Sequence, residues 1–280
     1  MGHGRRSRFD HHPFPAPDYW NQPSRLGSHL LEVLFTPTDY EALTPASLKD
    51  AVCVVFDVLR ATSSMVAALY HGALSIQPAK SVADAVQLKQ LRPGCLLAGE
   101  RDGVRIRSDV TGSIDFQLGN SPQEFTPSVV KDKSIIMTTT NGTRALHACR
   151  GASATLICSF LNLRATAEYL LKLDPNSLFL ICSGTGERVA YEDVLGAGAL
   201  ISLVREQRSC MPLTDSALMA HRLYQLEESD LERGLARSIN GERLMALPEL
   251  RGDVSFCAQR DRFPLVAGTT GDATIAVIRG

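Results

Sequence analysis

The chain has 280 residues, of which 44% are hydrophobic, and its 29 Lys and Arg residues nearly balance 30 Asp and Glu residues. A chain of this length and composition can bury one large core or two small ones, which argues against a disordered or fibrous protein. Its formal charge of −1 argues against nucleic acid or an anionic membrane as partner, because such binding depends on many Lys and Arg contacts with phosphate. A small molecule is therefore the expected partner.

The cysteines and the apolar runs bear on location. Seven cysteines without a CxxC pair predict neither a disulfide framework nor a zinc site. No apolar run approaches the roughly 18 residues that span a bilayer, and the arginines near the start are not followed by the apolar core of a signal peptide. We expect a cytoplasmic protein with no membrane partner. A homodimer is the assembly considered, although no motif specifies it.

Residues 1–28 differ from the rest of the sequence. They mix histidines and arginines with four prolines and show no hydrophobic periodicity, which predicts a flexible or disordered arm. The domain expected to fold is residues 29–280, in one lobe or two. Within it, residues 208–250 are helical in pattern, rich in charge and without a strand-like run, so they are interpreted as an insertion or a lid.

From Leu31 onward, short β-branched runs alternate with segments of helical periodicity, which predicts a three-layer α/β/α fold with a mainly parallel or mixed sheet. The predicted strands are 31–36, 51–58, 73–78, 95–98, 134–139, 154–159, 177–182, 254–258 and 274–278. The predicted helices are 62–71, 81–91, 143–149, 162–173 and 191–207.

Three segments share one local design: an apolar strand, a polar turn and then a helix. The turns follow the strands that end near Asp57, at Thr138 and at Cys182. In open α/β sheets such turns collect at the carboxyl ends of the strands, where helix N-termini and free backbone N–H groups favour anions. We therefore expect the functional site at these three turns.

Asp57 ends an apolar strand, so its carboxylate is expected at the sheet edge beside Arg60, Thr62 and Ser63. The alternative is that Asp57 only caps the following helix. If Glu100, Glu192 and Asp193 converge with Asp57, these carboxylates could hold one Mg²⁺, which prefers oxygen ligands. Taken singly, each acid is more often a surface or helix-start residue.

The second turn carries three threonines before Asn141, Gly142, Thr143 and Arg144. Backbone N–H groups at such a turn, together with the guanidinium of Arg144, could hold a phosphate or sulfonate. The alternative is an ordinary Asn-Gly turn with a threonine cap. We favour the anion site, since a cap needs only one threonine.

In the third turn five residues separate Cys182 from Arg188, which is the Cys-x5-Arg spacing used by cysteine-dependent phosphatases. In those enzymes a thiolate attacks phosphate while loop amides and the arginine hold it. The alternative is a buried strand cysteine followed by a Gly-rich turn. The spacing alone is a weak signal in a chain with seven cysteines.

Several ordered blocks resemble the 2-phosphosulfolactate phosphatase family, the Mg²⁺-dependent phosphatases of coenzyme M biosynthesis. The most specific block is Thr138 to Leu146, TTTNGTRAL. The others are Phe56 to Ser63, Ala98 to Arg101, Leu118 to Pro122, Cys182 to Gly184, Glu192-Asp193 with Gly196 to Gly198, and Asp253 to Ala258. Together the blocks extend over nearly all of the chain from Leu31 onward.

The resemblance implies hydrolysis of (R)-2-phospho-3-sulfolactate to 3-sulfolactate and phosphate, with Mg²⁺ as cofactor. The substrate would be a small phosphorylated, sulfonated or carboxylated anion, which suits arginines at loop positions. The predicted catalytic residues are Asp57, Arg60, Arg144 and Cys182. The predicted substrate-binding residues are Thr62, Ser63, Arg101, Asn120, Ser121, Thr139, Thr140, Asn141, Gly142, Thr143, Ser183 and Gly184. The predicted metal ligands are Asp57, Glu100, Glu192 and Asp193.

Three hypotheses about the function remain open at this point. In the leading hypothesis a metal-activated water attacks the phosphate, although attack by Asp57 is an alternative. The rival within the same class uses Cys182 as nucleophile and Arg188 as phosphate clamp, without a metal. The rival from another class is a non-catalytic protein that binds small anions.

Overall fold

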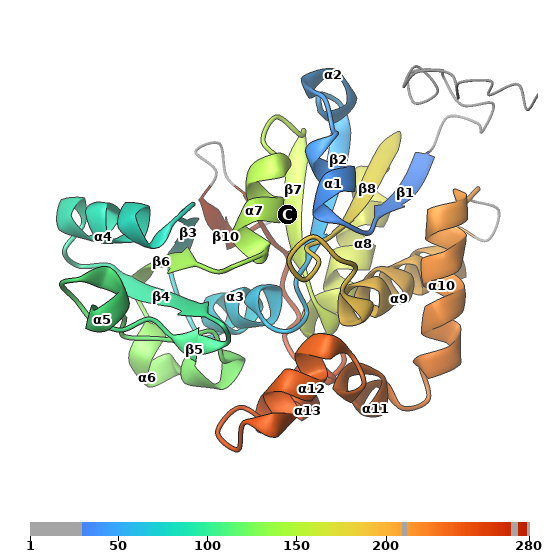
Figure 1. The fold of residues 1–280 in the computed structure, drawn as a ribbon. Helices are drawn as coiled ribbons and strands as arrows, with labels where there is room; N and C mark the ends of the chain where they lie inside the picture. The colour runs from blue at the N-terminus through green and yellow to red at the C-terminus, as the bar shows by residue number, and fades with distance from the viewer. Residues whose placement is uncertain (1–29, 209–211, 270–273, 279–280) are drawn as a thin grey trace, which may run out of the picture.

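The computed structural model describes residues 30–208, 212–269 and 274–278. The arm predicted for residues 1–28 lies outside the described residues. The remainder is a mixed ten-stranded sheet covered by helices, as the alternation of strand and helix patterns predicted. The three-layer α/β/α fold class is confirmed (Figure 1).

The strands agree with the predicted ranges at eight of nine places. They are β1 Leu30–Leu34, β2 Ala51–Phe56, β3 Ser75–Pro78, β4 Leu96–Arg101, β5 Val104–Arg105, β6 Ser134–Thr138, β7 Ala154–Cys158, β8 Ser177–Cys182, β9 Ala267–Thr269 and β10 Ile275–Val277. The two short strands β5 and β9 were not predicted.

All five predicted helices are present. The helices are α1 Pro37–Glu41, α2 Pro45–Leu48, α3 Ala61–Tyr70, α4 Val82–Leu91, α5 Ser108–Thr111, α6 Pro127–Val130, α7 Gly142–Ala148, α8 Leu163–Leu173, α9 Tyr191–Gln207, α10 Asp215–Glu227, α11 Leu231–Ala236, α12 Ile239–Ala246 and α13 Gly252–Cys257, with 3₁₀ turns at Pro122–Glu124 and Phe160–Asn162. The described part of 208–250 is helical, as its charge-rich pattern predicted.

The strand predicted at 254–258 was wrong, because this segment lies in helix α13. Its buried side chains are Asp253, Val254 and Cys257. Val254 and Cys257 are three positions apart, which is the spacing of one helix face and not of a strand. The prediction gave weight to the β-branched and aromatic residues and missed this spacing.

The sheet consists of two parallel groups of strands. Its order is β1-β8-β2-β7-β9-β10-β3-β6-β4-β5. Strands β1, β8, β2 and β7 are parallel, and so are β3, β6 and β4. The antiparallel strands β9 and β10 join the groups through three reversals, so the two groups run in opposite directions within the sheet. In Figure 1 the β3-β6-β4 group lies to the left of the β1-β8-β2-β7 group.

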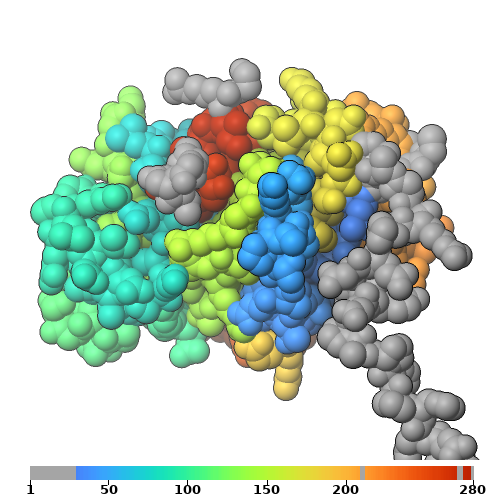
Figure 2. Space-filling model, turned by 90° about the horizontal axis from the view of Figure 1, so that it is seen from above, coloured from blue at the N-terminus to red at the C-terminus, as the bar shows by residue number. Residues whose placement is uncertain are grey.

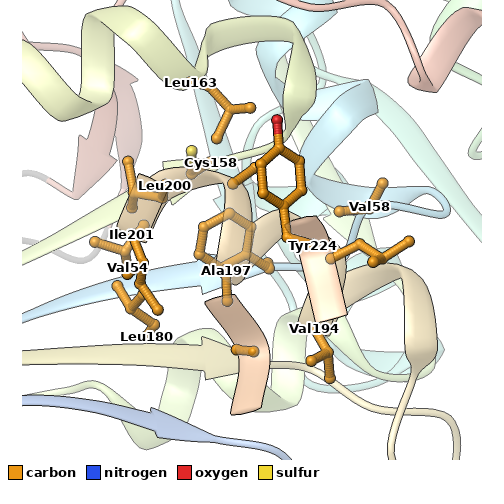
Figure 3. Packing of buried hydrophobic residues seen from close by; sticks show 14 of the residues in the cluster. Val54, Val58, Cys158, Leu163, Leu180, Val194, Ala197, Leu200, Ile201 and Tyr224 are labelled. Atoms are coloured by element: carbon orange, nitrogen blue, oxygen red, sulfur yellow. The ribbon is translucent and has the colours of Figure 1, made fainter. Parts of the chain in front are cut away.

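One core covers the outer face of the first group. Alternate residues of β2, namely Val52, Val54 and Phe56, point into it. Figure 3 shows Val54 and Leu180 of the strands against Leu200 and Ile201 of α9, with Tyr224 of α10 nearby. This packing fixes α9, and therefore the acidic residues of its first turn, against the carboxyl end of β2.

A second core joins the two groups of strands. The other face of β2 contributes Cys53 and Val55, and the second group contributes Ile135 and Met137. Helix α3 lies in this core, with nine of its ten residues buried. A smaller third core packs α4 on the far side of β4 and β6. Because α3 is enclosed between the groups, the turn that precedes it is held in place from both sides.

Two expectations from composition can be compared with the described residues. The six cysteines among them are free thiols, and all are buried. No helix in the ranges 30–208, 212–269 and 274–278 combines the length and apolarity required to cross a membrane.

Candidate active site

The carboxyl ends of strands from both groups meet at one polar cavity of about 390 Å³. Asp57 follows β2, and Thr139 to Asn141 follow β6. Gly142 lies so close that a Cβ there would stand 2.7 Å from Asp57 Oδ2, which explains why a glycine occupies this position. The cavity is lined by Asp57, Leu59, Arg60, Glu100, Asp102, Gly103, Asn120, Thr139, Thr140, Asn141, Thr185, Gly186, Asn240, Arg243, Leu244 and Leu247.

The Asp57 carboxylate is the most perturbed acid of this cavity. It is 8% exposed, and its Oδ1 accepts a hydrogen bond of 3.0 Å from the backbone N–H of Ala61. Burial, and to a smaller extent the neighbouring carboxylates of Glu100 and Glu192, raise the pKa of Asp57 to about 7, against the N–H bonds from Ala61 and Gly142 that lower it. A buried carboxyl whose pKa lies near neutrality, in a cavity, is typical of functional sites.

Glu100 reaches the same cavity from the end of β4. Its Oε1 accepts from the backbone N–H and the hydroxyl of Thr140, both at 3.0 Å, and its Oε2 accepts from the N–H of Gly103 at 2.8 Å. These bonds hold the carboxylate toward the turn after β6. Sequence spacing alone did not show that Thr140 orients Glu100.

Glu192 and Asp193 begin helix α9 and are both 1% exposed. Asp193 accepts hydrogen bonds from the backbone N–H groups of Val58 and Gly184, so it ties together the ends of β2 and β8. Glu192 accepts a 2.6 Å bond from Asn240. Burial raises the pKa of both acids, and for Asp193 the adjacent Glu192 and Asp57 raise it further. Neither acid is part of the cavity lining.

The donor set fits Mg²⁺ with few protein ligands. Among residues 30–208, 212–269 and 274–278, no three His, Cys, Asp or Glu side chains are grouped closely enough to hold a metal by themselves. Mg²⁺, however, is commonly bound by one or two carboxylates, waters and a substrate phosphate. Asp57 and Glu100 supply two carboxylates in one cavity, and a bound cation would offset both the burial and the repulsion from Glu100 that raise the pKa of Asp57.

Arg60 lines the cavity but is already paired. Its Nη1 donates to Asp253 at 2.7 Å, and both side chains are almost completely buried. Asp253 also accepts from Ser121 at 2.6 Å and from Gln123 at 3.0 Å. Ser121, predicted to bind substrate, therefore belongs to the network that orients Arg60. The peptide bond between Leu59 and Arg60 is cis.

Arg101 and Arg144 do not line the Asp57 cavity. Arg101 donates to its neighbouring carbonyl at Glu100 and to the hydroxyl of Thr138. Arg144 forms ion pairs with Glu41 and Glu187 on the surface. Of the three arginines predicted in the site, only Arg60 therefore lines the cavity that contains Asp57.

Cys182 is the last residue of β8 and is completely buried. Burial raises the pKa of its thiol well above the ordinary value, and the carboxylates of Asp193 and Glu192 raise it further. A reactive thiolate requires a lowered pKa and access. Arg188 is exposed, and its carbonyl accepts from Thr185 N–H in the turn after β8. The geometry therefore argues against the cysteine-dependent mechanism.

Several predicted substrate-binding residues serve the local structure. The hydroxyl of Thr62 donates to the carbonyl of Asp57, that of Ser63 to Val58, and that of Thr143 to Thr139. Gly184 adopts a φ of 77°, which explains the glycine in the turn after β8. These four residues shape the turns that carry the site.

Other predicted residues have polar atoms that are available for a ligand. Asn120 Oδ1, Thr139 Oγ1 and Ser183 Oγ are buried and lack a hydrogen-bond partner within the described part of the chain. Asn120 and Thr139 line the cavity, and so does Asn141, whose Oδ1 accepts from Gly186 N–H. Because buried polar groups are normally bonded, unpartnered atoms in a cavity wall indicate a place for a polar ligand.

Sequence reasoning missed the contribution of helix α12. Asn240, Arg243 and Leu244 of this helix close one side of the cavity. Arg243 forms no hydrogen bond or ion pair within the described part of the chain, so it is the uncommitted cation of the lining. The charge-rich pattern of 208–250 marked a distinct helical segment but did not show which of its charges face the site. Asp253, which orients Arg60, was not predicted as a site residue, because the segment that follows it was wrongly predicted as a strand.

Comparisons with known proteins identify the family of this chain. The family model described as 2-phosphosulpholactate phosphatase matches residues 38–271. The chain belongs to the 2-phosphosulfolactate phosphatase family. A relative named probable 2-phosphosulfolactate phosphatase, from Carboxydothermus hydrogenoformans, is 39% identical over 84% of this chain and 91% of its own length. Relatives with the same printed name from Pseudothermotoga lettingae and Caldicellulosiruptor saccharolyticus are 38% and 36% identical, over 85% and 81% of this chain and 94% and 93% of theirs. The family resemblance noted from the sequence is thereby confirmed.

Proposed function

We propose that this phosphatase-family protein hydrolyses (R)-2-phospho-3-sulfolactate to 3-sulfolactate and phosphate, with Mg²⁺. The single observation that carries the proposal is the buried Asp57 carboxylate, with a pKa near 7, in a cavity that also contains Glu100, Arg60 and Arg243. The names of the relatives supply the substrate class. The cavity combines carboxylates for a cation with arginines for anionic groups.

Asp57 and Glu100 are the side chains that would hold Mg²⁺, with Glu192 close enough to influence Asp57 electrostatically. When bound, the ion would neutralise phosphate charge and lower the pKa of a coordinated water. Asp193, although predicted as a ligand, does not line the cavity, and its two oxygens accept from the N–H groups of Val58 and Gly184. We therefore assign Asp193 to positioning the ends of β2 and β8.

The cavity's own residues would bind and orient the substrate. Arg60 has donors left beyond those used by Asp253 and the carbonyl of Gly103, and its orientation is fixed by these two bonds. Arg243 suits a second acidic group, because its charge is not otherwise engaged. Asn120 and Thr139 present unpartnered oxygens to polar atoms of the substrate. Such fixed donors favour phosphoryl transfer by positioning and charge neutralisation.

Water is the preferred nucleophile in this proposal. Asp57 has one oxygen bonded to Ala61 N–H, and its second oxygen faces Gly142. In the metal-free protein its pKa near 7 lets it accept a proton close to neutral pH, whereas a bound Mg²⁺ would keep it ionised and would itself activate the water. Direct attack by Asp57 on the phosphate is the alternative within the same site.

The test measures phosphate release from phosphosulfolactate by the wild type, Asp57→Asn and Asp50→Asn, with and without EDTA. Asp50 is an exposed aspartate outside the cavity and provides the matched control. We expect both EDTA and Asp57→Asn to lower kcat at least 100-fold, while Asp50→Asn remains within twofold of the wild type. Full activity of the chelated enzyme or of Asp57→Asn would contradict the metal-centred model. Binding of sulfolactate without turnover of any monoester would favour a non-catalytic binder.

A further inference from the structure

A second, larger cavity lies on the other side of Thr139 and Thr140. Its volume is about 600 Å³, and it opens between α1, α7 and the loop before α4. In Figure 2, α7 (yellow-green) lies between α1 and α2 (blue) and α4 (teal). The cavity is lined by Tyr40, Glu41, Leu43, Lys80, Thr139, Thr140, Thr143, Arg144, His147 and Ala148. The hydrolysis proposed above uses none of its basic residues.

Two buried polar atoms in this wall have no hydrogen-bond partner among the residues that the structure describes. They are Thr139 Oγ1, on a side chain that is 4% exposed, and His147 Nε2. Burial, together with the nearby charges of Arg150 and Lys80, lowers the pKa of His147 to about 4, so the ring is neutral at pH 7. A neutral imidazole carries one N–H donor. Both atoms can therefore bond to a polar ligand without an added charge.

The charges of the wall favour an anion. Lys80 forms no hydrogen bond or ion pair within residues 30–208, 212–269 and 274–278. Arg144 is shared between Glu41 and Glu187, of which Glu41 also lines the cavity and opposes an anion. These two glutamates are 47% and 66% exposed, and ion pairs at such exposed positions contribute little. An incoming oxyanion can therefore compete with the two glutamates for the guanidinium of Arg144. Lys80 adds a positive charge that does not first have to leave an ion pair.

We propose that this cavity binds a small oxyanion of the phosphate or sulfonate class, at Lys80, His147 and Thr139, apart from the group held beside Asp57. The proposal stands on the cavity and its unpartnered donors, and it does not require phosphatase turnover. Its occupant has two sources. It is either a free oxyanion or the distal acidic group of a substrate that extends past the shared Thr139–Thr140 wall.

The experiment uses inorganic phosphate as probe and isothermal titration calorimetry on the full chain. The variants are Lys80→Gln and His147→Leu, and Lys49→Gln is the control, because Lys49 is exposed, carries the same charge and lies outside the cavity. Steady-state kinetics with phosphosulfolactate accompany the titrations. Circular dichroism of each variant checks that it is folded.

We expect Lys80→Gln to weaken one phosphate-binding event at least fivefold, or to raise KM at least fivefold with kcat retained, while Lys49→Gln changes neither. Two phosphates per wild-type chain, one of them lost in Lys80→Gln, indicate a free oxyanion. One phosphate per chain with the raised KM indicates the substrate's own distal group. Phosphate affinity and KM within twofold of the control in both Lys80→Gln and His147→Leu would overturn the proposal. If the wild-type protein shows no phosphatase activity but binds phosphate, and Lys80→Gln weakens that binding, only the proposed hydrolysis is refuted.

Discussion

Two sets of buried charges lie at the same cavity, and they are organised in opposite ways. Arg60 and Asp253 form a pair of opposite charges, and Asp253 takes further bonds from Ser121 and Gln123. Asp57, Glu100 and Glu192 are like charges, and burial together with the carboxylates of Glu100 and Glu192 raises the pKa of Asp57. The first set is compensated within the protein itself. The second set is not compensated in this way. Its carboxylates therefore require a cation or a proton from outside the chain.

The difference separates positioning from chemistry. A buried pair with satisfied hydrogen bonds fixes a geometry, and breaking it leaves an uncompensated charge. A buried group of like charges costs stability and is retained where a site needs a shifted pKa. Substitutions in the two sets should therefore change stability in opposite directions.

The largest effect on stability is expected from Asp253→Asn. Removing this carboxylate charge leaves Arg60 buried without a counter-ion, which should lower the free energy of unfolding by about 3–5 kcal/mol. Urea denaturation measures it, with the exposed Asp230→Asn as control. A loss below about 1 kcal/mol would show that the pair is not compensated as described.

An opposite, smaller effect is expected from Asp57→Asn in EDTA. The pKa of Asp57 is raised from 3.8 to about 7, so between these pH values the folded state keeps a proton that the unfolded state has released. Stability therefore falls as pH rises through this window. Asp57→Asn does not undergo this pH-dependent loss of stability. It should therefore be more stable than the wild type by about 1–3 kcal/mol at pH 8.

The measurement is the melting temperature of both proteins at pH 4.5 and pH 8. The advantage of Asp57→Asn should grow toward pH 8 and shrink when Mg²⁺ is added to the wild type. A variant that is less stable than the wild type at pH 8 would mean that the Asp57 carboxylate is compensated within the chain, like Asp253.

The smallest effect is expected from Arg144→Gln. Arg144 is an exposed counterpart of Arg60: it joins Glu41 and Glu187, whose side chains are about half exposed or more. Such pairs contribute about 0–1 kcal/mol, and they weaken with salt. Urea denaturation at low and high salt measures it. If the substitution lowers the free energy of unfolding by more than about 2 kcal/mol, the ion pairs of Arg144 behave like the buried pair and not like surface pairs.

Much of the fold could be predicted because its elements follow local patterns. The apolar run of β2, buried along its whole length, and the helical spacing of α8 are both legible in the sequence. The three-residue β9 and the two-residue β5 were missed, since segments this short have no periodicity to detect. Helix α13 was misread because weight was given to its β-branched and aromatic residues over the three-residue spacing of Val254 and Cys257, and the contact of Asp253 with Arg60, 193 residues away, leaves no local signal.

The candidate site was predictable at its turns and not in its long-range partners. Asp57, Glu100 and Thr139 to Asn141 were found because each follows an apolar strand. Arg243 was missed, since an arginine on a charge-rich helix has the same local pattern whether it faces solvent or a cavity. Arg144 was misplaced for the same reason: its position after a turn is local, but its partners Glu41 and Glu187 come from elsewhere.

The hairpin β9–β10 has a consequence for the order in which the molecule can be assembled. The strands of the second group, β3, β4 and β6, all lie between β2 and β7 in the chain, yet the strands that join the two groups come after every other strand. During synthesis both groups can pair their own parallel strands before residues 267–277 exist. The carboxyl ends that carry Asp57 and Thr139 are joined through one sheet only when this last segment is inserted. The continuous sheet behind the site is therefore completed by the last residues made, although most residues of the site are made early.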